Sequence, residues 1–177
     1  MLTDKIKPGK NPPDEIYVLV EIPQGSSIKY EINEESGELF VDRFLHTAMF
    51  YPLNYGFIPQ TLEGDGDPVD VLVLSDQPVT PRSIIPARPI GLLETEDQEG
   101  IDAKIVAVPL NKIDPAYSGF NEYTDLPKSL QDKIVHFFEQ YKNLEAGKWT
   151  KVRGWQSAIV AKEKIREAME RYQKENK

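Results

Sequence analysis

Three aspartates, Asp65, Asp67 and Asp70, stand within six residues of one another, where a glycine-rich turn leads into the apolar run 71–74. Side chains alternate along a strand, and both faces of this one are apolar, so Asp70 is expected to be largely buried. A buried carboxylate without a partner costs a large free energy and takes up a proton unless a cation meets it. A hard divalent metal ion is the partner that this pattern favours.

The acidic stretch has two other interpretations. A solvated Asp-Gly turn would explain the segment 64–67 taken alone, but it does not explain Asp70 inside the apolar run. A calcium loop of the EF-hand type is excluded, because its third acidic position falls on Val69, its required glycine falls on Asp70, and Pro68 interrupts it.

A second group of acids comprises Glu96, Asp97, Glu99 and Asp102. Lys104 lies two residues beyond Asp102, hence on the same face of the expected strand 101–108, and Lys29 and Glu31 repeat this spacing. One such pair is more often a surface ladder pair. Several acid-plus-base strands in one small β-rich chain favour a common site.

Arg43, Tyr55, Tyr141 and Lys142 add side chains that donate hydrogen bonds to phosphate oxygens. Metal-binding acids and phosphate-binding donors on one scaffold indicate a site for a metal-bound polyanion. The sequence has no phosphate-binding P-loop, no Gly-x-Gly-x-x-Gly motif and no cysteine, and its histidines are His46 and His136. Cysteine ligation and nucleotide cradles of these kinds are therefore not supported.

Strand-like runs of β-branched and aliphatic residues, separated by Gly, Pro and Asn, fill the first two thirds of the chain; they span residues 16–22, 27–32, 39–41, 69–74 and 101–108. They predict a closed or strongly curved antiparallel sheet, with a hairpin loop at 33–37. A helical period then predicts an amphipathic helix opened by Asp125 and Pro127 and closed at Gly147. A second helix, capped by Ser157, follows. Without repeats or linkers, residues 1–177 are expected to form a single domain.

Charge and hydropathy narrow the possible partners. The chain has 21 Lys and Arg against 29 Asp and Glu, a formal net charge of −8, which is the wrong sign for nucleic-acid backbones or anionic lipid. No run approaches the ~18 apolar residues of a membrane span, and the start of the chain has no apolar leader segment. We expect a cytoplasmic protein with neither a nucleic-acid nor a membrane partner.

At these residues the chain resembles the soluble family I inorganic pyrophosphatases of the prokaryotic type. The segment 65–71, Asp-Gly-Asp-Pro-Val-Asp-Val, matches the family motif at every position, and further matches occur at 28–31, 41–43, 51–56, 102–104 and 136–142. The resemblance implies a mainly β fold with α-helices (α+β), namely an OB-like five-stranded closed β-barrel with two C-terminal helices packed outside. It also implies Mg²⁺-dependent hydrolysis of pyrophosphate and a homohexamer built as a dimer of trimers.

The family's functional residues carry over position by position. Asp65, Asp70 and Asp102 resemble ligands of the tightest metal, Asp97 and Asp102 resemble holders of a substrate-borne metal, and Glu21 and Glu31 resemble outer or accessory ligands. Asp67 resembles the general base acting on the attacking water. The implied phosphate-binding residues are Lys29, Arg43, Tyr55, Lys104, Tyr141 and Lys142. Oxygen-only ligation favours Mg²⁺, with Mn²⁺ as a possible substitute.

The sequence departs from the family pattern at Gln98 and Ile101, where relatives often carry further acids. The local electrostatic field is therefore less negative, which bears on the affinity for the more weakly bound metal ions. Two other functions remain open. A metal-dependent nucleotide phosphohydrolase would need a base-stacking pocket, and the sequence offers no clear candidate. A non-catalytic β-barrel would bind a divalent metal or an oligonucleotide, and the latter needs a basic groove with stacking aromatics.

Overall fold

The computed structural model describes residues 5–33, 36–98 and 100–176, so the tip of the expected hairpin loop at 34–35 and Glu99 lie outside the described residues. The strands are β1 (Ile16–Ile22), β2 (Ile28–Ile32), β3 (Leu39–Phe44), β4 (Asn54–Phe57), β5 (Asp70–Val73), β6 (Ile84–Asp97), β7 (Gly100–Pro109) and β8 (Thr150–Ser157). The helices are α1 (Lys128–Gln140) and α2 (Ala158–Glu175), with short 3₁₀ turns η2 (Pro115–Tyr117) and η3 (Tyr123–Asp125).

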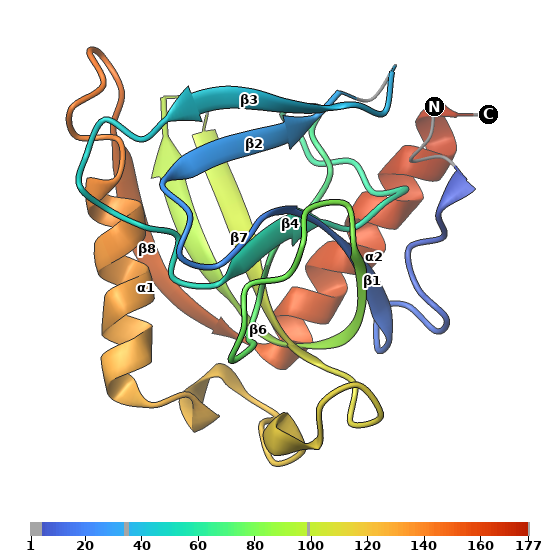
Figure 1. Cartoon of the computed structure of the whole chain (residues 1–177). Helices are drawn as coiled ribbons and strands as arrows, with labels where there is room; N and C mark the ends of the chain where they lie inside the picture. Colours follow the sequence, from blue (N-terminus) through green and yellow to red (C-terminus); the bar gives the residue numbers. More distant parts are fainter. Residues whose placement is uncertain (1–4, 34–35, 99, 177) are drawn as a thin grey trace.

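Five strands close into a ring in the order β1-β4-β5-β7-β6, because β6 also pairs with β1 (Figure 1). The strand β8 extends the sheet from β6, and β2 and β3 form a separate two-stranded hairpin. The prediction of a mainly β fold with a five-stranded ring and two C-terminal helices is thus confirmed. One detail differs, since β5 and β7 run parallel rather than antiparallel.

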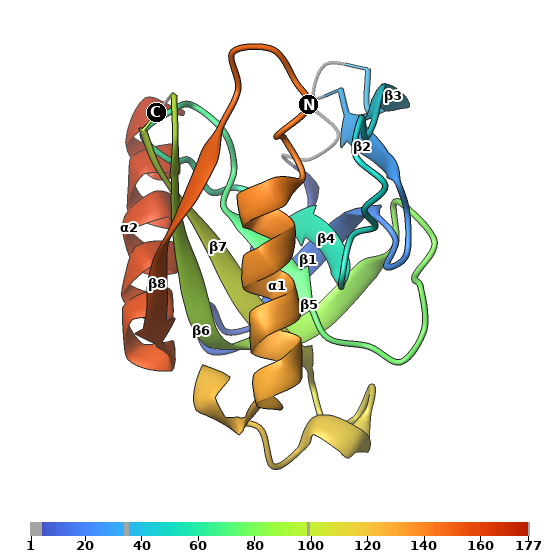
Figure 2. The ribbon, with the colours of Figure 1, turned by 90° about the vertical axis from the view of Figure 1, so that its left-hand side faces the viewer.

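Two layers of apolar side chains hold the helices to this sheet. Ala161, Ile165 and Ala168 of α2 join one buried cluster, and α2 packs against β6 and β8. Phe137 and Phe138 of α1 join the other cluster, and α1 packs against β8. Figure 2 shows the two helices beside β8, with α1 in front and α2 at the edge of the molecule. Within the described residues, no helix has the length and apolar character needed to cross a membrane.

The helix boundaries confirm one prediction and correct another. The Ser157 hydroxyl accepts a hydrogen bond from the N–H of Val160 and caps α2, as expected. The first helix ends at Gln140 instead of continuing to Gly147, and Asp125 caps the preceding turn η3 rather than α1. The apolar stripe looked longer than the helix because apolar residues continue into the loop that follows it.

The strands β4, β6 and β8 are not among the runs predicted from the sequence, and β3 continues beyond the predicted run 39–41 to Phe44. Pro86, Pro89 and Gly91 interrupt the apolar pattern of β6, and its pairing register with β7 shifts between Pro89 and Gly91. Such an irregularity lets a strand bend around a closed sheet. Proline and glycine therefore mark curvature within a long strand here, rather than its end.

Candidate active site

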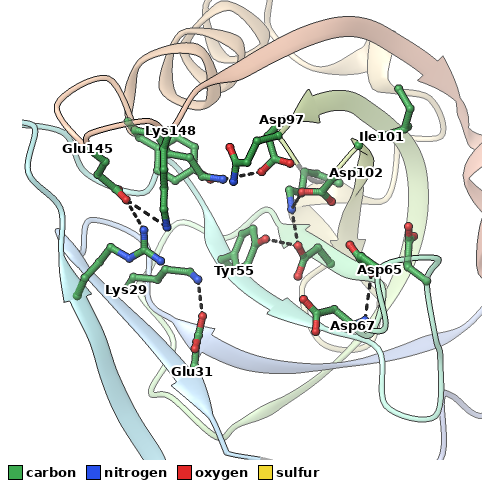
Figure 3. A pocket seen from close by; sticks show the side chains of 18 of the residues that line it. Lys29, Glu31, Tyr55, Asp65, Asp67, Asp97, Ile101, Asp102, Glu145 and Lys148 are labelled. Carbon is green, nitrogen blue, oxygen red and sulfur yellow. Dashed lines mark hydrogen bonds and ion pairs between the residues drawn. The ribbon is translucent and has the colours of Figure 1, made fainter.

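A cavity of about 280 Å³ lies where the β2–β3 hairpin faces the ring, and the loop after α1 completes its wall (Figure 3). Of the residues to which the family resemblance assigns a role, all but one line it: Lys29, Glu31, Arg43, Tyr55, Asp65, Asp67, Asp70, Asp97, Asp102, Lys104, Tyr141 and Lys142. The exception, Glu21, lines an adjoining cavity whose wall also includes Asp67 and Asp70. The fold thus brings together residues that are up to 121 positions apart in the sequence.

Asp70 and Lys104 form the centre of the site. Asp70 is the first residue of β5, and its Oδ2 accepts hydrogen bonds from the Tyr55 hydroxyl and the Lys104 ammonium. The Lys104 Nζ also lies 2.5 Å from Oδ2 of Asp102, which shares its face of β7. Because β5 and β7 are neighbours in the ring, their acidic ends meet at one point.

Burial by itself would lower the pKa of Lys104, but the Asp70 carboxylate, the Tyr55 oxygen and the Asp102 carboxylate raise it well above its ordinary value. Burial and the Asp70 charge also raise the pKa of the Tyr55 hydroxyl. Both groups therefore keep their protons at neutral pH and act as donors toward anionic oxygens. Lys104 is only 5% exposed, so its charge depends on these two carboxylates.

The end of α1 supplies Tyr141 and Lys142. The Tyr141 ring stacks on Phe137 at a centroid distance of 5.0 Å, and this contact anchors the tyrosine to the core. The Lys142 Nζ lies 2.8 Å from Oδ2 of Asp97, at the end of β6. Burial opposes the charge of Lys142, whereas Tyr141 and the Asp97 carboxylate raise its pKa.

The β2–β3 hairpin supplies the opposite wall. Lys29 pairs with Glu31 along β2, and its Nζ lies 3.6 Å from Oδ2 of Asp42 on β3. The Arg43 Nε lies 2.6 Å from Oδ2 of the same Asp42, and its Nη1 pairs with Glu145 from the loop after α1. Lys29 and Arg43, the two cations of the hairpin, are thus each held by two carboxylates.

Asp65 and Asp67 lie in the exposed turn between β4 and β5. The N–H of Asp67 donates to Oδ1 of Asp65 at 3.1 Å, and the N–H of Glu63 donates to the Asp67 carbonyl at 2.7 Å. Gly66 adopts a φ of 98°, which a residue with a Cβ rarely reaches. The turn geometry therefore requires the glycine between the two aspartates.

Glu21 lies on β1, beside the adjoining cavity. Burial raises its pKa to about 8, although the Ile32 N–H donates to its Oε1 at 2.7 Å, and the charges of Asp70 and Glu31 add to the rise. A cation entering the adjoining cavity would favour the ionised carboxylate. Its role as an accessory ligand stays a prediction.

Three charged cavity residues were missed by the sequence reasoning: Glu63, Glu145 and Lys148. Glu63 precedes the acidic motif and pairs with Lys164 of α2 at 3.3 Å, and Lys148 lies 3.6 Å from Glu145. They were missed because they stand in loops without periodicity. Conversely, Glu96 pairs with Arg153 and is not among the cavity residues.

The cavity wall is rich in charge of both signs. Eight carboxylates and five cationic side chains are present among its described lining residues, and Gln98 and Ile101, the two departures from the family pattern, also lie on this wall. Within the described segments, no three acids or histidines already converge as ligands of one ion, because the central carboxylates contact Lys104 and Lys142. The carboxylate groups of this wall nevertheless offer oxygen atoms as metal ligands, which suit hard divalent cations.

Comparisons with known proteins identify the family of the chain. Residues 18–173 match the family model for inorganic pyrophosphatase. An inorganic pyrophosphatase from Aquifex pyrophilus is 57% identical over 172 residues, covering 97% of each chain, and one from Saccharolobus solfataricus is 57% identical over 167 residues, covering 94% of this chain and 97% of the relative. The solved structure of the Helicobacter pylori inorganic pyrophosphatase superposes with a TM-score of 0.92 at 47% identity, covering 96% of this chain and 99% of the other. The chain therefore belongs to the inorganic pyrophosphatase family, as its resemblance to that family predicted.

Proposed function

We propose that the chain hydrolyses inorganic pyrophosphate to two orthophosphates in a Mg²⁺-dependent reaction, by direct attack of water. The observation that carries this proposal is the convergence of Asp70 and Asp102 with Lys104 in a cavity that is also lined by Lys29 and Arg43. Such an arrangement combines oxygen ligands for a hard metal with donors for a dense anion. The pyrophosphatase relatives support the same substrate.

Four aspartates fit a divalent metal by their chemistry and position: Asp65, Asp70, Asp97 and Asp102, with Glu31 and Glu21 as accessory ligands. Carboxylate-only ligation favours Mg²⁺, and Mn²⁺, which also suits oxygen ligands, is a substitute. When bound, such an ion lowers the pKa of water and neutralises charge on phosphate oxygens. Asp70, Asp97 and Asp102 would exchange their contacts with lysine for contacts with the metal.

The chain's own side chains divide the remaining work. Lys29, Arg43 and Lys142 approach the cavity from different elements, and with Lys104 and the hydroxyls of Tyr55 and Tyr141 they would hold the phosphate oxygens. Asp67, which lies in the turn opposite these donors, would accept the proton of the attacking water at its carboxylate. Asp70 would thus serve as a metal ligand, and Asp67 as the proton acceptor.

We extend the proposal to assembly and location. Residues 1–177 would form one pyrophosphatase domain that assembles as a homohexamer, a dimer of trimers, in the cytoplasm. The apolar stripe of α1 is buried in the chain's own core, so the exposed face that carries His136 remains for a contact. Phe40, Phe44 and Phe50 are more than half exposed on or near the β2–β3 hairpin, which supports contact with a second copy. Light scattering that returned a monomer at micromolar concentration would contradict the assembly.

The decisive experiment measures phosphate release from pyrophosphate with Mg²⁺, with Mn²⁺, and in excess chelator, using ATP as the competing substrate. We expect hydrolysis of pyrophosphate only with a divalent ion, and poor hydrolysis of ATP. Equal rates on ATP and pyrophosphate would favour a nucleotide phosphohydrolase. Metal binding without phosphate release would leave a non-catalytic metal-binding protein, and undiminished activity in chelator would refute the metal dependence.

A further inference from the structure

The acidic turn is the tip of a closed loop, residues 58–69, that joins β4 to β5. At its base, the Ile58 N–H donates to the Val69 carbonyl at 3.0 Å. The Thr61 hydroxyl bridges the same two residues, because it donates to the Ile58 carbonyl at 2.6 Å and accepts from the Val69 N–H at 2.9 Å. One buried hydroxyl therefore joins both ends of the loop that carries the acids.

This bridge acts directly beside the predicted metal ligand. Val69 is fully buried and immediately precedes Asp70, while Pro68 has no N–H to offer. A buried backbone N–H needs a hydrogen-bond partner, and the Thr61 hydroxyl is the partner here. The backbone orientation at Val69 sets the direction in which Asp70 enters the cavity, so the hydroxyl constrains that direction.

The helix α2 holds the outer side of the same loop. The Leu62 N–H donates to the Ala168 carbonyl at 3.1 Å, and the Leu62 carbonyl accepts from Nη1 of Arg171 at 2.8 Å. Glu63 pairs with Lys164 of the same helix. Thr61 thus lies between the loop residues that α2 holds and the strand β5.

We infer that Thr61 is a positioning residue that sets the placement of Asp70 and Asp67 in the site. The inference rests on the proposed function for the roles of these two aspartates. A site of this kind needs its carboxylates held to within about 0.5 Å. Removal of the hydroxyl leaves the Val69 N–H without its partner, and the loop base must then shift to find another.

The test compares Thr61→Val, which has nearly the same shape but no hydroxyl, with Thr61→Ser, which keeps the hydroxyl. Ile85→Val is the stability control, because Ile85 is buried in the core and does not line the cavity. Three quantities are measured on each: Mg²⁺ affinity by calorimetry without substrate, kcat and KM for pyrophosphate, and Tm. We expect Thr61→Val to weaken Mg²⁺ binding about 10-fold or more and to lower kcat. Thr61→Ser should keep both quantities within about 3-fold of those of the unmodified protein.

Two outcomes would overturn the inference. The first is a Thr61→Val protein that resembles Ile85→Val, with a lower Tm but unchanged Mg²⁺ affinity and kcat. The second is fast hydrogen exchange of the Val69 amide in the unmodified protein, which is informative even if Thr61→Val does not fold. An unmodified protein that binds Mg²⁺ but releases no phosphate would refute the proposed function instead, and the calorimetric comparison of the variants would still decide the role of Thr61.

Discussion

Asp67 and Asp70 stand three residues apart, yet the structure places them in opposite surroundings. Asp70 contacts two buried donors, the Tyr55 hydroxyl and the Lys104 ammonium, whereas Asp67 is exposed in the turn before β5. The paired substitutions Asp67→Asn and Asp70→Asn keep the size of each side chain and remove its charge. We therefore expect Asp70→Asn to lower stability and Mg²⁺ affinity, and Asp67→Asn to lower turnover while leaving both nearly unchanged.

The expected size of the effect at Asp70 follows from its partners. Removing one partner of a buried ion pair costs about 3–5 kcal/mol. Lys104 keeps the Asp102 carboxylate at 2.5 Å, and asparagine still accepts the Tyr55 hydrogen bond, so we expect about 1–3 kcal/mol of lost stability. For a domain of this size, that lowers Tm by about 3–10 °C. Asp67→Asn should change the free energy of unfolding by no more than about 0.5 kcal/mol.

The functional consequences should divide in the same way. Asp70→Asn removes charge from the proposed metal ligands, so Mg²⁺ binding without substrate should weaken about 10-fold or more, together with turnover. Asp67→Asn cannot accept the proton of the attacking water, so kcat should fall about 100-fold or more while Mg²⁺ affinity and KM largely persist.

The assay combines calorimetric Mg²⁺ titration, phosphate release at saturating Mg²⁺ and thermal unfolding in chelator, for both variants and the unmodified protein. If Asp67→Asn lost Mg²⁺ affinity as badly as Asp70→Asn and regained full turnover at saturating metal, then Asp67 would be a ligand and its assignment as general base would be wrong. An unchanged Tm for Asp70→Asn would refute the stabilising role of the pair with Lys104.

Three further outcomes follow from individual contacts. Glu145→Gln removes one of the two charges that hold Arg43, so KM for pyrophosphate should rise about 5-fold with kcat nearly unchanged; a kcat loss at constant KM would contradict this role. Gly56→Ala should cost more than about 3 kcal/mol in denaturant unfolding, since the new Cβ would lie 2.0 Å from the Leu19 carbonyl oxygen, and a fully stable variant would refute that packing. Two backbone N–H groups lower the pKa of Asp125 in the folded protein. Its carboxylate therefore stabilises the fold fully above about pH 4, the pKa of an aspartate in the unfolded chain, and this stabilisation disappears as the pH falls through the lower pKa of the folded state. The Tm difference between the protein and Asp125→Asn should therefore shrink on acidification, and a constant difference would count against it.

Local patterns predicted a large part of the fold. The strand β1 was predicted with its observed bounds, because an unbroken apolar run reports burial directly. The hydroxyl cap of Ser157 at the start of α2 was predicted from the residue type that precedes the helix. The strand β6 was missed because its prolines and glycine serve a bend of the closed sheet, and a bend imposed by ring closure leaves no periodic signal along the chain.

The sequence by itself determined the chemistry of the protein: the acids around Asp70, the cations that accompany them and the family to which the motif belongs. Only the tertiary structure decided which groups meet. It pairs Arg43 with Glu145, 102 residues apart, places both Asp70 and Asp102 on the buried Lys104, and joins the base of the acidic loop through Thr61. The physical reason is that residue type and spacing report burial and local geometry, whereas a contact between distant segments depends on the closure of the sheet, which no local pattern encodes.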